Sequence, residues 1–95
     1  MKLFLVHCGF YDENWGSNIF ENHTNFFVVA EDAAAAKKAV KEKSESKKHR
    51  MHIDGIIEVQ QVDGYKIELQ PTSSKESQFQ LHTQRELAPK PAPTT

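Results

Sequence analysis

The sequence predicts a two-layer α+β domain of the order strand, strand, helix, strand, strand, with a single helix packed on a four-stranded mixed sheet. Three patterns predict it: short apolar stretches, one alanine- and lysine-rich stretch with helical spacing, and an Asp63-Gly64 turn between alternating segments. The 95 residues suffice for one small domain. Because a strand–helix–strand connection is right-handed and returns the chain to the same end, the expected strand order is 2-1-3-4.

The first strand is expected from Lys2 to Cys8, ending at Gly9, and the second from Asn25 to Ala30. Both faces of the first strand are largely apolar, so it should lie in the centre of the sheet. Alternation divides its side chains between the two faces. Leu3, Leu5 and His7 share one face, and Phe4, Val6 and Cys8 share the other.

The helix is expected from Ala33 to Lys43, with Asp32 as its N-cap. Its apolar stripe is thin and small, which allows close packing on one face of the sheet. The other face then needs a cover. A two-fold partner is the simplest cover, and we therefore expect a homodimer. The loop after the first strand and the C-terminal tail are the alternatives.

The last two strands are expected to form a hairpin around Asp63-Gly64. A two-residue turn would pair Val62 with Tyr65. A three-residue loop instead pairs Gln61 with Tyr65 and gathers the apolar side chains on one face. We therefore predict a type I turn with a G1 bulge and a left-handed Gly64.

The composition changes near residue 70. All glycines lie before this point, and all prolines lie after it. Residues 1–70 are expected to form the single domain. Residues 71–95 are polar and proline-rich, and we expect them to be disordered. Ser77 to His82 alternates polar and apolar residues, so a short edge strand there stays open.

Composition also excludes several classes of protein. A single cysteine excludes a disulfide framework and a cysteine-based zinc ribbon. No stretch of about 18 apolar residues is present, and the N-terminal apolar run ends at Val6 without a cleavage site. The net charge of −1 excludes a globally basic nucleic-acid binder. A cytoplasmic location without membrane partners is expected.

Met1 to Leu69 resembles the bacterial domain of unknown function 1543 family. The resemblance rests on the strand ending at Gly9, Glu21-x-His23, Phe27-Val28, His52-Ile53-Asp54 and the closing Val62-Asp63-Gly64-Tyr65. Two features differ: Phe10 replaces a second glycine, and the helix end is lysine-rich rather than Trp-Gly. The resemblance implies a small α/β fold and no particular activity.

Ionisable residues are expected to meet where the first strand ends and the second and third begin. They are His7, Glu21, His23, His52 and Asp54. A carboxylate beside an imidazole orients metal-binding histidines, and the helix C-terminus at this edge favours a cation. These residues therefore have the chemistry needed for a divalent-metal site or for an acid–base pair. Structural hydrogen bonding is the interpretation that the sequence favours, because the spacing matches no standard zinc motif.

Two further groups of residues are candidate binding surfaces. The first is an aromatic loop that either packs over the sheet or binds a ligand: Phe10, Tyr11, Trp15 and Phe20. The second is a basic patch in residues 37–50. This segment has a net charge of +5, while the rest of the chain has a net charge of −6. The candidate residues of the patch are Lys37, Lys41, Lys48 and Arg50. It could contact nucleic acid as a weak accessory, but a solvated helix face explains it better.

These observations favour a small non-enzymatic binding module that forms a homodimer. The alternatives are the metal or acid–base site at the histidine edge and the weak nucleic-acid accessory. The sequence holds no nucleophile–base pair and no cofactor fingerprint, so enzymatic activity is left open and not favoured. No cofactor is expected except a divalent metal at the histidine edge.

Overall fold

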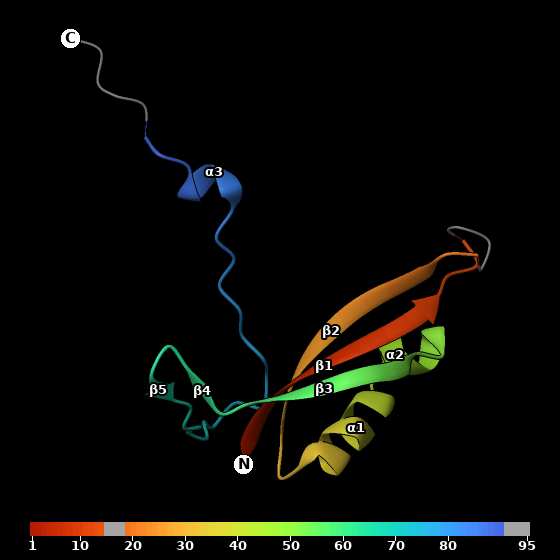
Figure 1. Cartoon of the computed structure of the whole chain (residues 1–95), viewed down its shortest axis with the longest axis horizontal. Coiled ribbons are helices and arrows are strands. Elements are labelled where there is room, and N and C mark those ends of the chain that lie inside the picture. Colours follow the sequence, from red (N-terminus) through yellow and green to blue (C-terminus); the bar gives the residue numbers. More distant parts are fainter. Residues whose placement is uncertain (15–18, 91–95) are drawn as a thin grey trace.

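The structure is a computed structural model that describes residues 1–14 and 19–90. Its centre is a three-stranded sheet of β1 (Lys2–Tyr11), β2 (Glu21–Ala30) and β3 (His52–Val59) (Figure 1). The order is β2-β1-β3, and β1 is antiparallel to both neighbours. The predicted central position of the first strand and the order 2-1-3 are confirmed. The predicted mixed sheet was wrong, because both pairings of β1 are antiparallel.

Both N-terminal strands are longer than predicted. Gly9 does not end β1, because its backbone pairs with His23 on one side and His52 on the other. Alternation continues through Phe10 to Tyr11, which pairs with Glu21 at the start of β2. Two aromatic residues assigned to the loop, Phe10 and Tyr11, are therefore strand residues.

Two helices replace the single helix expected to end at Lys43. Asp32 caps α1 (Ala33–Lys41) by accepting a hydrogen bond of 2.8 Å from the Ala35 N–H, as predicted. Lys43 is extended, and α2 follows over Ser44–His49. A continuous helix would have placed Lys43 and Lys47 on the stripe that Val40 begins, against the apolar sheet.

The core lies between α1 and one face of the sheet. The side chains of Phe4, Val6 and Cys8 are at most 1% exposed. The other core residues are Val28, Ala30, Ala36 and Val40. Alanines in α1 allow its backbone to approach the strands closely, as the thin apolar stripe predicted.

The opposite face of the sheet, called here the open face, carries the alternate residues of each strand. Near the N-terminal end of β1 it is apolar, with Leu3 and Leu5 flanked by side chains that are half exposed. Phe27, Val29 and Ile57 are 55%, 50% and 60% exposed. The homodimer expected to cover this region stays a prediction.

The fourth predicted strand lies outside this sheet. β4 (Gln61–Val62) and β5 (Tyr65–Lys66) form a separate hairpin in which Val62 pairs with Tyr65. Asp63 and Gly64 have φ values of 52° and 85°, as in a two-residue type I′ turn. The predicted three-residue register was wrong, because these side chains are exposed and no buried face selects the register.

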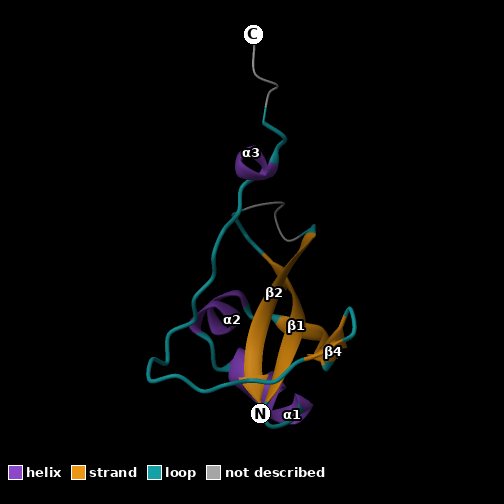
Figure 2. Ribbon diagram, turned by 90° about the vertical axis from the view of Figure 1, so that its left-hand side faces the viewer, coloured by secondary structure: helices purple, strands orange, loops and turns teal. Residues whose placement is uncertain are grey.

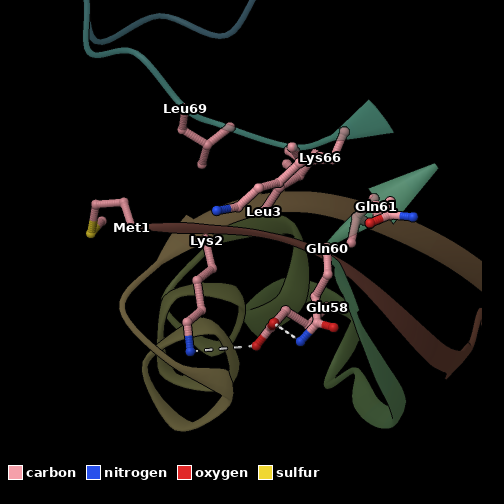
Figure 3. A pocket seen from close by; sticks show the side chains of 10 residues that line it. Met1, Lys2, Leu3, Glu58, Gln60, Gln61, Lys66 and Leu69 are labelled. Carbon is pink, nitrogen blue, oxygen red and sulfur yellow. Dashed lines mark hydrogen bonds and ion pairs between the residues drawn. The ribbon is translucent and has the colours of Figure 1, made fainter. Parts of the chain in front are cut away.

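The chain after the hairpin passes the N-terminal end of β1. There it bounds an open groove of about 400 Å³, which Leu3 and Leu69 line and where Lys2 pairs with Glu58 at 3.6 Å (Figure 3). Leu3 is six positions from Gly9 in the strand, roughly 20 Å along β1. This groove is therefore distinct from the histidine edge of the sheet.

The remaining tail runs beside β2 and then away from the sheet (Figure 2). The Phe79 ring lies 6.0 Å from that of Phe27, and Ser77–His82 forms no strand. Thr83 caps the short helix α3 (Gln84–Leu87). Whether residues 71–95 are disordered stays a prediction. Among the described residues, no helix is long and apolar enough to cross a membrane.

Candidate metal centre

Ionisable side chains gather on the open face at the end of β1 remote from the groove. The strand register places them there, because Gly9 pairs with both His23 and His52 while His7 pairs with Asn25 and Gly55. All five residues predicted at this edge converge. We call them the histidine–carboxylate cluster: His7, Glu21, His23, His52 and Asp54.

The shortest contacts in the cluster join imidazoles to carboxylates. His52 Nε2 lies 2.6 Å from Glu21 Oε1 and 3.1 Å from Asp54 Oδ1. His23 Nε2 lies 3.7 Å from Glu21 Oε2 and 3.6 Å from Asp54 Oδ2. Nitrogen and oxygen ligands of one zinc ion, each about 2.1 Å from it, lie roughly 3.0–3.5 Å apart. The observed separations are close to that range.

Gly9 provides the space in which these groups meet. A Cβ atom at position 9 would lie 2.5 Å from His52 Nε2 and 2.9 Å from Asp54 Oδ2, and it would also collide with Glu21 Oε1. Any side chain here would therefore force the cluster apart. Gly9 therefore shapes the cluster, a role that the sequence analysis missed, although glycine inside a strand is a known signal of close approach.

A β-bulge in β3 orients Asp54. His7 pairs with Gly55 and Cys8 with Ile53, which leaves Asp54 as the extra residue. The bulge allows both Ile53 and Ile56 to pack against the core, although they are three residues apart. The Asp54 carboxylate thereby lies on the open face beside His52 and His23.

His7 is oriented by two neighbours. Its ring stacks on that of His23, with centroids 5.0 Å apart and planes within 8°. Its Nδ1 lies 2.8 Å from Asn25 Oδ1, which accepts a hydrogen bond when Nδ1 carries the proton. Nε2 is then left as a ligand atom, which is how outer residues orient metal-binding histidines. Asn25 is a second residue that the sequence analysis missed.

α1 packs on the face of the sheet opposite the cluster, with Ala36 and Val40 in the core beside Phe4 and Val6. The helix predicted to direct its C-terminal dipole at the histidines therefore lies behind the sheet. The favourable charge for a cation comes instead from the Glu21 and Asp54 carboxylates. Both are about one-third exposed.

Cys8 is buried among the core side chains, as predicted, and takes no part in the cluster. Burial raises the pKa of the Cys8 thiol, and the negative charge of Asp54 adds to the rise. The thiol is therefore held in its neutral form. Cys8 behaves as a small apolar residue.

The aromatic candidates do not form one surface. Phe10 is half-buried on the helix side, where its ring lies 5.0 Å from that of His49. Tyr11 and Phe20 are about half exposed. Trp15 lies outside the described residues. The expectation that this loop covers the sheet is not met by Phe10, which contacts α2 instead.

The basic candidates lie on the helices and not at the cluster. Lys37 and Lys41 are exposed on α1, and Lys48 is exposed on α2. Arg50 ends α2 in a left-handed conformation, and with Lys48 it lines a cavity that also contains Asp12 and Glu13. Acidic side chains beside the basic ones weaken the case for a phosphate-binding surface.

Comparison with known proteins gives one finding. No curated protein and no solved structure matches the chain. The family model described as Domain of Unknown Function (DUF1543) matches residues 18–69, which include Glu21, His23, His52 and Asp54. Since the match covers more than half of the chain, this protein belongs to the DUF1543 family.

Proposed function

We propose that this protein binds divalent transition-metal ions at the histidine–carboxylate cluster. The observation that carries the proposal is the convergence of three imidazoles and two carboxylates, from three strands, around a position that has no side chain. Imidazole and carboxylate are the commonest protein ligands of such ions. Asn25 supplies the outer hydrogen bond that such sites use to fix a histidine.

A purely structural role explains the cluster less well. The side chains of His23 and His52 are 45% and 50% exposed, and those of the carboxylates are about one-third exposed. Ion pairs at such exposure contribute about 0–1 kcal/mol to folding. Confining five ionisable residues around Gly9 therefore adds little stability, whereas a metal ion would bind to the ligand atoms that these residues bring together.

The ligand types select among metals. Mixed nitrogen and oxygen ligands suit zinc, nickel, cobalt, iron(II) or manganese. Calcium and magnesium prefer oxygen ligands alone, and three histidines disfavour them. Copper(I) prefers sulfur ligands, and the only cysteine faces the core rather than the cluster. The cluster therefore has no thiolate to bind copper(I).

Thermal unfolding of the metal-free full chain with added zinc or nickel tests the proposal. An ion at 100 times its Kd stabilises the folded state by about 2.7 kcal/mol. For a domain of this size, that free energy raises the Tm by roughly 10 °C or more. His23→Ala and His52→Ala should each reduce the rise.

His82→Ala is the matched control. His82 Nδ1 also lies 3.3 Å from a carboxylate, that of Glu86 in α3, but this pair is remote from the cluster in the sequence and in the fold (Figure 1). This variant should keep the full metal-dependent rise. An unchanged Tm of the wild-type chain with zinc, nickel, cobalt and manganese would contradict the proposal.

A further inference from the structure

Each carboxylate of the cluster faces two histidines with different oxygen atoms. Glu21 directs Oε1 toward His52 and Oε2 toward His23, at 2.6 and 3.7 Å. Asp54 does the same, with Oδ1 3.1 Å from His52 Nε2 and Oδ2 3.6 Å from His23 Nε2. Both carboxylates thus lie between an imidazole of β2 and an imidazole of β3. Carboxylates placed this way can bridge two metal ions.

The ligand atoms also fall into two sets of three. One set is His7, His23 and Asp54, and the other is Glu21, His52 and Asp54. Within each set the ligand atoms lie within 4.8 Å of one another. Asp54 belongs to both sets, which is the arrangement that a shared carboxylate gives in a two-ion site.

Gly9 leaves room for this arrangement. Its missing side chain would occupy the space beside Glu21, His52 and Asp54, and it would contact the oxygen that Asp54 directs toward His23. The backbone of β1 therefore forms the base of the site, and both ions would lie above it on the open face. Paired ions in two-metal sites are about 3.5–4 Å apart, a spacing that one bridging carboxylate spans.

We propose that the histidine–carboxylate cluster holds two divalent ions, bridged by Asp54 and Glu21; this inference rests on the metal binding proposed above. The first ion is bound by His7, His23 and one oxygen of each carboxylate. The second is bound by His52 and the other two oxygens. Because the cluster is exposed, the remaining coordination positions face solvent.

Calorimetric titration of the metal-free full chain with zinc, and separately with manganese, measures the number of ions bound. Two ions per chain are expected. A stoichiometry of one ion per chain overturns the two-ion site and leaves the proposed metal binding intact. No binding overturns both. Manganese adds a second readout, because electron paramagnetic resonance of two bridged ions shows exchange coupling that a single ion does not.

Asp54→Asn is the sharpest variant. It preserves shape and one oxygen ligand, but the amide nitrogen does not bind an ion, so the Asp54 bridge is lost and one of the two ions loses a ligand. The expected stoichiometry falls from two ions to one, and the exchange coupling disappears. His82→Ala should keep two coupled ions. If Asp54→Asn also retains two coupled ions while its circular dichroism is unchanged, the bridging role is wrong.

Discussion

His52 Nε2 lies 2.6 Å from Glu21 Oε1, although these residues belong to strands that do not pair with each other. β1 lies between β2 and β3, so the backbones of the two outer strands are roughly 10 Å apart. The two side chains meet above Gly9, which pairs with residues of both outer strands. The cluster therefore depends on a central strand residue that has no side chain.

Gly9→Ala should weaken zinc binding at least tenfold. The added Cβ would lie 2.5 Å from His52 Nε2 and 2.9 Å from Asp54 Oδ2, so the ligands must separate. Gly55→Ala is the control, because a Cβ there meets nothing within 4 Å. Calorimetric Kd values for both variants give the comparison. Equal affinities for Gly9→Ala and wild type would show that position 9 does not shape the site.

Asn25→Ala should lower zinc affinity about 10–100-fold, the usual effect of removing an outer partner of a metal-binding histidine. The variant loses the acceptor 2.8 Å from His7 Nδ1, and the imidazole then rotates more freely. Asn25→Asp keeps an acceptor oxygen and should restore the affinity. If the alanine and aspartate variants bind zinc equally well, Asn25 does not orient His7.

The raised pKa of Cys8 predicts how stability changes in alkaline solution. Below the ordinary thiol pKa of 9.0, folded and unfolded chains both keep the proton, so this residue has no effect. Above it, the unfolded chain loses the proton while the folded chain keeps it, and the free energy of unfolding falls with pH. Urea unfolding from pH 7 to pH 10 should show a shallower decline for Cys8→Ala. Identical declines in the two proteins would contradict this.

The exposed apolar part of the open face predicts self-association. Phe27, Val29 and Ile57 are each at least half exposed, and a second copy would remove them from water. Light scattering should give twice the chain mass of 10.8 kDa. Ile57→Lys should give a single chain, because a charge would be buried in the interface. A wild-type mass of 10.8 kDa would rule out the homodimer.

The sheet order could be predicted because alternation reveals which strand is apolar on both faces. Phe4 and Val6 on one face and Leu3 and Leu5 on the other required a central strand. The same topology predicted which edge carries His7, His23 and His52. These features follow from a period of two residues, which the printed sequence displays directly.

Other features depend on contacts that no period reveals. Gly9 was interpreted as a strand end, whereas it is a paired strand residue beneath the cluster. The register of the second hairpin was chosen to gather apolar side chains on a buried face, but Tyr65 is 77% exposed and the turn chemistry of Asp63 and Gly64 prevails. The helix breaks at Lys43 because a continuous helix would place lysine side chains against the apolar face of the sheet, a contact that the helical spacing alone does not reveal.

The most direct test of metal binding follows the side-chain nitrogen signals of all histidines by NMR during a zinc titration of the full chain. Five histidines are present, and His49 and His82, which lie outside the cluster, are internal controls. The account predicts large shifts for His7, His23 and His52, with His49 and His82 unchanged. Signals that do not move, or that move equally for all five histidines, would contradict it.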